Sequence, residues 1–188
     1  MPLKVTFELS DKDLRYFRKV MREARDAARH ADETSILAAA GQLLEHVSKA
    51  EVPQFVKERL LKVRPMIDML EDREWQLKGE DRERVLSALA YFNEPHDLIP
   101  DHVPGFGYMD DAIMVQLVVD ELSPELEAYA DFCAARKAFE KKRAARSAEA
   151  REKYLAPKRD SLQARMRRRR RARRGQGARA PRAPFTLW

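Results

Sequence analysis

Apolar residues recur at helical spacing through most of the chain. The first run begins at Leu14, and three more follow over residues 36–47, 52–70 and 85–92, each with charged residues on the other faces. Spacing of three and four residues is typical of amphipathic helices that bury one stripe. We therefore predict a compact all-α bundle of five to six helices, covering residues 10–135.

Local signals indicate where these helices begin and break. Ser10 is followed three residues later by Asp13, which is the pattern of a helix N-cap. Pro65 lies inside the third run, and proline removes a backbone donor and clashes with the preceding turn. We expect that helix to bend or split near Arg64, and Gly79 to separate it from the fourth helix.

The stretch from Ala112 to Val119 is apolar on nearly every face. Such a pattern is typical of a fully buried helix, and the stretch is far shorter than the roughly 20 residues needed to cross a bilayer. We predict that it forms the central helix of the bundle. Asp110 or Asp111 is expected to cap this helix, since its unpaired N–H groups and dipole favour a carboxylate.

The N-terminal residues follow a different period. Leu3, Val5, Phe7 and Leu9 alternate with polar residues, as in a half-buried strand. No second strand is evident downstream, so residues 1–9 are predicted to form a short extended arm. This arm either lies against the helices or pairs with its copy in another subunit, which would give a homodimer.

The two parts of the chain carry opposite charge. Residues 1–133 hold 17 Lys or Arg against 27 Asp or Glu, whereas residues 134–188 hold 20 against 4. We predict that residues 136–157 form a charged, solvent-exposed helical extension. Residues 158–188 are predicted to be a long basic, largely disordered tail, in which helix persists to about Arg174 at most.

The tail has ten arginines between Arg165 and Arg182 and no acidic residue. Guanidinium groups bind phosphates through paired hydrogen bonds, and the run contains no aromatic residue on which bases could stack. These features predict non-specific binding to nucleic acid or to an anionic membrane surface; a solvated tail, or one folded back on the acidic body, is the alternative. The polyanion-binding candidates are Arg165, Arg167, Arg168, Arg169, Arg170, Arg171, Arg173 and Arg174.

The segment "NEPHDLIPDHVPGFGYMDD", residues 93–111, holds the residues best suited to chemistry. Its carboxylates Asp97, Asp101, Asp110 and Asp111 could hold Mg²⁺ or Ca²⁺, and a metal-dependent hydrolase would use such a site to activate water. The spacing matches no known catalytic or metal-binding signature, however. The prolines and glycines instead favour a stiffened corner that feeds the central helix, with a partner-binding surface as a further alternative.

The same segment resembles the signature of the YkvA-like family, a bacterial domain-of-unknown-function family, with the region of resemblance at residues 88–122. The matching positions are Pro95, Asp97, Leu98, Ile99, Pro100, Asp101, Pro104, Gly107, Asp110 and Asp111. The resemblance implies a small helical domain of uncharacterised activity, sometimes predicted to be membrane-associated. His96 and His102 stand where that pattern usually carries apolar residues, which argues against them as ligands.

Compartment signals are few. The single Cys133 excludes an internal disulfide, and the N-terminus lacks the hydrophobic core of a signal peptide. We expect a cytoplasmic location or a peripheral one at the membrane, where the terminal "PFTLW" could enter the interface. The predicted function is that of a non-enzymatic binding or adaptor protein without a cofactor. A peripheral membrane protein and a metal-dependent hydrolase are the alternatives.

Overall fold

The computed structural model describes residues 9–27, 30–93, 99, 108–141 and 147–176. These residues form helices and turns, with no strand among them, so the predicted all-α class is confirmed. Residues 1–8 of the predicted arm lie outside this part of the chain. The helices are α1 (Asp11–Ala27), α2 (Glu33–Lys49), α3 (Gln54–Leu60), η2 (Leu61–Val63), α4 (Arg64–Glu71), α5 (Gly79–Leu89), η3 (Ala90–Asn93), α6 (Met109–Glu121), α7 (Ser123–Glu140) and α8 (Ala148–Gln176).

Side-chain caps fix the starts of the first two helices. The backbone amide and hydroxyl of Ser10 donate to the Asp13 carboxylate at 2.9 and 2.6 Å, and the Asp13 amide donates back to Ser10 Oγ at 3.3 Å. This reciprocal pattern confirms the predicted N-cap of α1. At α2, Asp32 Oδ1 accepts a hydrogen bond of 2.9 Å from the Ser35 amide.

The third apolar run is divided by its proline. α3 ends at Leu60, a single 3₁₀ turn follows, and α4 begins at Arg64 with Pro65 in its first turn. The predicted break near Arg64 is therefore confirmed. Because one predicted helix became two, the chain up to residue 135 has slightly more helices than the five to six expected.

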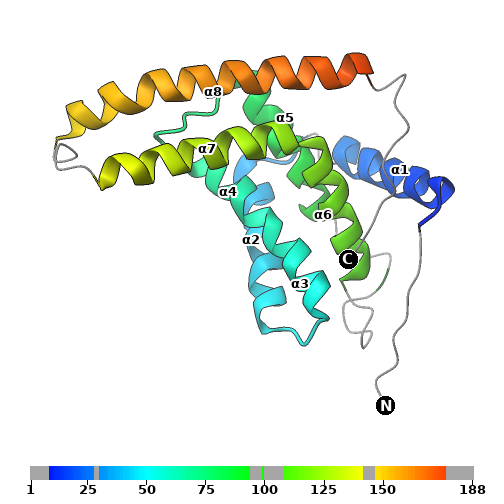
Figure 1. Ribbon diagram of the computed structural model, residues 1–188. Helices are drawn as coiled ribbons and strands as arrows, with labels where there is room; N and C mark the ends of the chain where they lie inside the picture. The colour runs from blue at the N-terminus through cyan, green and yellow to red at the C-terminus, as the bar shows by residue number, and fades with distance from the viewer. Residues whose placement is uncertain (1–8, 28–29, 94–98, 100–107, 142–146, 177–188) are drawn as a thin grey trace.

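α6 is the central helix, as predicted. Its side chains are buried on nearly every side, including Ile113, Met114 and Val118. It contacts α1, α3 and α7, and Figure 1 shows it descending from α7 beside α3. The largely apolar sequence from Ala112 to Val119 fits this position, since a helix surrounded by others has little surface for charged residues.

The connection between α4 and α5 is packed under α7. The fully buried ring of Trp75 lies against those of Tyr129 and Phe132, with ring centroids 5.7 and 5.1 Å apart. Asp72 Oδ1 holds the turn by accepting from the amides of Glu74 and Trp75 at 2.9 and 3.1 Å. The turn is thus part of the core and is covered by α7.

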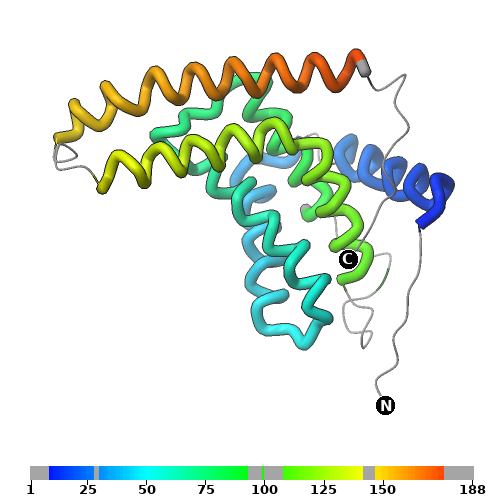
Figure 2. Tube along the Cα trace, viewed as in Figure 1, coloured from blue at the N-terminus to red at the C-terminus, as the bar shows by residue number. Residues whose placement is uncertain are grey.

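The C-terminal third corrects two predictions. α7 ends at Glu140, and α8 runs back antiparallel along it (Figure 2), so residues 136–157 are not one solvent-exposed extension. Helix also continues to Gln176, close to the predicted limit at Arg174, so the greater part of residues 158–188 is helical and not largely disordered. The physical reason is packing: Leu155 and Met166 of α8 are fully buried and belong to the same core as α1 to α7.

Candidate functional site

The arginine-rich helix α8 forms the outermost layer of the molecule, above α7 (Figure 1). Leu155, Leu162 and Met166 follow one another at helical spacing along its inner face and pack on the core. Arg159 and Gln163 lie in the same region and donate to the backbone carbonyls of Glu74 and Trp75 at 3.0 and 2.8 Å. α8 is therefore a docked helix with a defined inside and outside.

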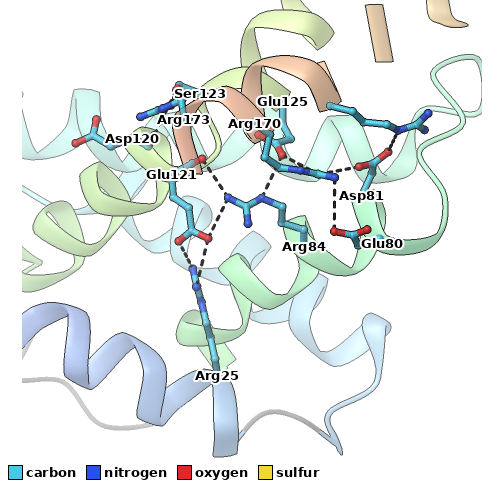
Figure 3. A network of polar contacts seen from close by, with 11 residues as sticks. Arg25, Glu80, Asp81, Arg84, Asp120, Glu121, Ser123, Glu125, Arg170 and Arg173 are labelled. Atoms are coloured by element: carbon cyan, nitrogen blue, oxygen red, sulfur yellow. Dashed lines mark hydrogen bonds and ion pairs between the residues drawn. The ribbon is translucent and has the colours of Figure 1, made fainter. Parts of the chain in front are cut away.

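One arginine of the run points inward. The Arg170 side chain is 9% exposed and donates to Asp81 Oδ1 at 2.7 Å and to Glu125 Oε1 at 3.3 Å, as Figure 3 shows. The acceptor side chains are 4% and 0% exposed. Burial alone lowers the pKa of Arg170, but the hydrogen bonds and charges of both carboxylates outweigh it and raise that pKa, so the group stays ionised.

The ion pairs continue across the molecule. Arg84 of α5 donates from Nε to Glu125 Oε1 at 3.1 Å and lies 3.3 Å from Glu121 of α6. Glu121 in turn accepts from Arg25 of α1 at 2.9 Å. Through these alternating charges α8 is joined to α1 by way of α5, α6 and α7 (Figure 3). We call this set, with Asp81 and Arg170, the buried ion-pair network.

Three arginines line the edge of α8 that faces α7. Arg165 pairs with Asp131, Arg169 pairs with Glu127, and Arg173 donates to the Ser123 hydroxyl. Partners on both helices are spaced by four residues, so the contacts form an antiparallel ladder along the seam. About half of the surface of Arg169 and of Glu127 remains exposed. We refer to Arg165, Arg169 and Arg173 as the α7-side row.

The opposite edge carries a second row. Arg167 donates from Nε to Asp81 Oδ2 of α5 at 2.7 Å, and its own side chain is 47% exposed. Arg171 and Arg174 follow at the four- and seven-residue spacing that places them on the same face. We refer to Arg167, Arg171 and Arg174 as the α5-side row. Arg168 lies between the two rows and is exposed.

Three of the eight predicted polyanion-binding arginines are exposed without an ion-pair partner among the residues that the structure describes: Arg168, Arg171 and Arg174. The other five contact the body. The arginine-rich segment thus has features of both alternatives, a folded-back tail and a solvated one. It packs on acidic residues of the body and still presents basic side chains to solvent. The acidic partners could not be found from spacing, because Asp81 and Glu125 are distant in sequence.

The proline-rich corner is described only in part. Pro95, Asp97, Leu98, Pro100, Asp101, Pro104 and Gly107 lie outside the described residues, as do His96 and His102. Asp110 Oδ2 accepts a hydrogen bond of 3.0 Å from the Ile99 amide, so this carboxylate ties the corner to α6. Such a bond to backbone favours the structural interpretation of Asp110.

The predicted cap of α6 is wrong in detail. The N-cap position is occupied by Tyr108 with φ of 63°, and Asp110 and Asp111 are buried in the first turn. Both carboxylates still lie at the positive end of the helix dipole. Within the described part of the chain, no three His, Cys, Asp or Glu side chains are placed to hold a metal ion. A metal site that includes Asp97 and Asp101 stays a prediction.

A second polar cluster surrounds Asp72 below α7. Asp72 Oδ2 accepts from Arg136 at 2.6 Å and from the Tyr129 hydroxyl at 3.0 Å. Burial raises the pKa of Asp72, but the Arg136 hydrogen bond and those from backbone and Tyr129 outweigh it and hold that pKa below its usual value. The hydrogen bond from Arg151 likewise lowers the pKa of Glu74. The cluster joins the Trp75 turn to α7 and α8.

Part of the chain matches a known family model. Residues 84–117 match the family model described as "Protein of unknown function (DUF1232)", a span from α5 to α6 that includes the corner. This supports a resemblance to an uncharacterised bacterial domain family over that span. No curated protein and no solved structure matches the chain. Among the described residues, no helix is both long and apolar enough to cross a bilayer.

Proposed function

We propose that this protein is a non-enzymatic binding protein that contacts nucleic acid through the exposed face of α8. The observation that carries the proposal is the position of Arg168, Arg171 and Arg174, which project from a docked helix without a carboxylate partner among the described residues. A folded helix holds the backbone of these arginines in place, so less backbone entropy is lost on binding than in a disordered tail.

Phosphate is the anion that suits these side chains. A guanidinium group is permanently charged and donates two parallel hydrogen bonds to a phosphate group. Nucleic acids also release condensed counterions when their phosphates are neutralised, which drives binding without sequence readout. The acidic body of residues 1–133 repels a polyanion, so α8 is the face through which it would approach.

The membrane alternative has less support from the described residues. A helix that lies in a bilayer interface needs an exposed apolar face, whereas the apolar residues Leu155, Leu162 and Met166 of α8 pack on the core. The terminal "PFTLW", which also supported the membrane hypothesis, lies outside the described residues. Nucleic acid is therefore the proposed partner, and a cytoplasmic location is proposed with it.

The corner around Asp110 is proposed as scaffold rather than as an active site. Its support is the hydrogen bond from the Ile99 amide to Asp110, which uses a candidate ligand to hold the backbone. We also propose the finer YkvA-like assignment, from the positions that match its signature. The hydrolase alternative depends also on Asp97 and Asp101, and a homodimer would form through an arm of which residues 1–8, like those two aspartates, lie outside the described part of the chain.

The proposal is tested by measuring the affinity of the whole protein for a fluorescent DNA duplex of about 20 base pairs at low salt. Replacing Arg168, Arg171 and Arg174 with glutamine is expected to weaken binding about tenfold or more, since each arginine neutralises a phosphate. All three side chains are exposed, so the fold should be unaffected.

The matched control replaces Lys49, Lys57 and Lys62 with glutamine, which removes the same charge from α2, α3 and η2 and leaves α8 unchanged. This control should bind DNA nearly as tightly as the unmodified protein. Equal losses in the two variants, or no binding by the unmodified protein, would count against the proposal. Binding to vesicles with anionic lipid but not to the duplex would favour the membrane alternative.

A further inference from the structure

The two rows of arginines on α8 lie on opposite sides of the helix. The α7-side row contacts Asp131, Glu127 and Ser123 of α7, whereas Arg167 of the α5-side row contacts Asp81 of α5. Both rows lie at the border between the docked and the exposed face, and Arg168 lies between them on the outside. α8 therefore presents two parallel lines of positive charge rather than one.

The separation of the rows suits one kind of nucleic acid. An α-helix with its side chains is about 10 to 12 Å wide, and the major groove of B-form DNA is about 12 Å wide, with a line of phosphates on each side. A single strand offers one line of phosphates. Duplex RNA has two, but its major groove is deep and narrow and does not admit a helix.

We propose that the partner of α8 is double-stranded B-form DNA, with the helix lying along the major groove and its two rows contacting the phosphates of the two strands. This inference rests on the proposed function and names its partner. Arg168 then faces the floor of the groove. A single arginine facing the base edges gives little sequence readout, so positioning on the backbone dominates.

Arginines of α8 can exchange their carboxylate partners for DNA phosphates while the helix stays packed on the core. The pairs of Arg165 with Asp131 and of Arg169 with Glu127 are exposed, and exposed ion pairs are weak, so phosphates can replace these carboxylates. Arg170 is different, because its partners Asp81 and Glu125 are buried and inaccessible to DNA. The buried ion-pair network, with the apolar inner face, keeps α8 in place while the two rows bind.

The test compares two variants with equal loss of charge, one in each row. Arg165→Gln with Arg169→Gln weakens the α7-side row, and Arg171→Gln with Arg174→Gln weakens the α5-side row. Affinities are measured by fluorescence anisotropy at one salt concentration for a DNA duplex of about 20 base pairs, one strand of that duplex, and the RNA duplex of the same sequence. Lys49→Gln with Lys57→Gln is the charge-matched control, and circular dichroism checks that every variant is folded.

Each row variant should weaken binding of the DNA duplex about fivefold or more, since each removes contacts to one of the two strands. The single strand can move to the remaining row, so each variant should change its affinity by about twofold or less. The RNA duplex has the same number of phosphates and should bind the unmodified protein more weakly than the DNA duplex does. Preference for the DNA duplex over the RNA duplex therefore reports groove shape and not charge.

Two results would overturn this inference: equal affinity of the unmodified protein for the two duplexes, or loss of DNA binding in only one row variant. These outcomes leave the proposed function standing if the variant that replaces Arg168, Arg171 and Arg174 still loses binding. If that triple variant binds every nucleic acid as well as the unmodified protein does, the proposed function itself fails and this inference fails with it.

Discussion

Arg170 differs from its neighbours in the arginine run because its side chain is buried among carboxylates. Asp81 and Glu125 accept from its guanidinium group, and Arg84 shares Glu125 with it. Buried charges are stable only when paired and hydrogen-bonded, since their loss of hydration is large. Six flanking arginines, 165, 167–169, 171 and 173, carry the same charge in the sequence, so composition alone cannot identify the one that points inward.

Arg170→Gln is predicted to lower the free energy of unfolding by about 2 to 4 kcal/mol, because it removes one partner from a buried pair. Urea denaturation followed by circular dichroism measures the change. The matched substitution Arg168→Gln, on the exposed face of the same helix, should change stability by about 0.5 kcal/mol or less. Equal effects of the two substitutions would show that Arg170 is not buried among carboxylates as described.

The lowered pKa values of Asp72 and Glu74 predict how the free energy of unfolding depends on pH. Both carboxyl groups have a pKa below the ordinary values of 3.8 and 4.5, so the folded protein binds their protons less readily than the unfolded chain does. Their contribution is therefore present above those ordinary values and is lost as the pH falls through them and then through the lower folded-state values.

Thermal unfolding between pH 7 and about pH 3 measures this contribution. The variant Asp72→Asn with Glu74→Gln should be less stable at neutral pH and should lose less stability on acidification than the unmodified protein. Asp68→Asn with Glu71→Gln, two exposed carboxylates of nearby α4, is the control and should keep the original pH dependence. An unchanged acid profile in the first variant would refute the assigned role of the Asp72 cluster.

At the scale of elements, α8 is where sequence and structure differ most. The split at Pro65, the cap at Ser10 and the buried central helix were all predicted, because each depends on residues near one another in sequence. The return of α8 along α7 depends on partners that are distant in the chain. Leu155, Leu162 and Met166 lie at helical spacing, but they are sparse among charged residues, and their pattern does not show which part of the chain they would pack on.

The docking of α8 is tested by Met166→Ala. Met166 is fully buried, so the substitution leaves a cavity and is predicted to lower the free energy of unfolding by about 2 to 5 kcal/mol. Leu61→Ala, at a side chain that is 46% exposed, should have a much smaller effect in the same urea denaturation. A disordered C-terminal segment would instead make Met166→Ala as neutral as the control.

At the scale of the whole molecule, the basic C-terminal segment packs on the acidic part of the chain. The acidic excess of residues 1–133 and the basic excess that follows were evident from composition. The structure shows that α8 pairs with part of this acidic charge and leaves Arg168, Arg171 and Arg174 exposed. The sequence could not predict which arginines do which, since this depends on the side of the helix that faces the core. The corner that matches the uncharacterised family contributes support for α6 through Asp110.

The central claim, that the exposed face of α8 binds nucleic acid phosphates, is tested most directly by the salt dependence of DNA binding. The logarithm of the association constant is measured against the logarithm of salt concentration for the unmodified protein and for the variant lacking Arg168, Arg171 and Arg174. Each lost phosphate contact reduces the slope by about 0.9, so the variant should have a slope smaller by about two to three. Identical slopes for the two proteins would contradict the claim.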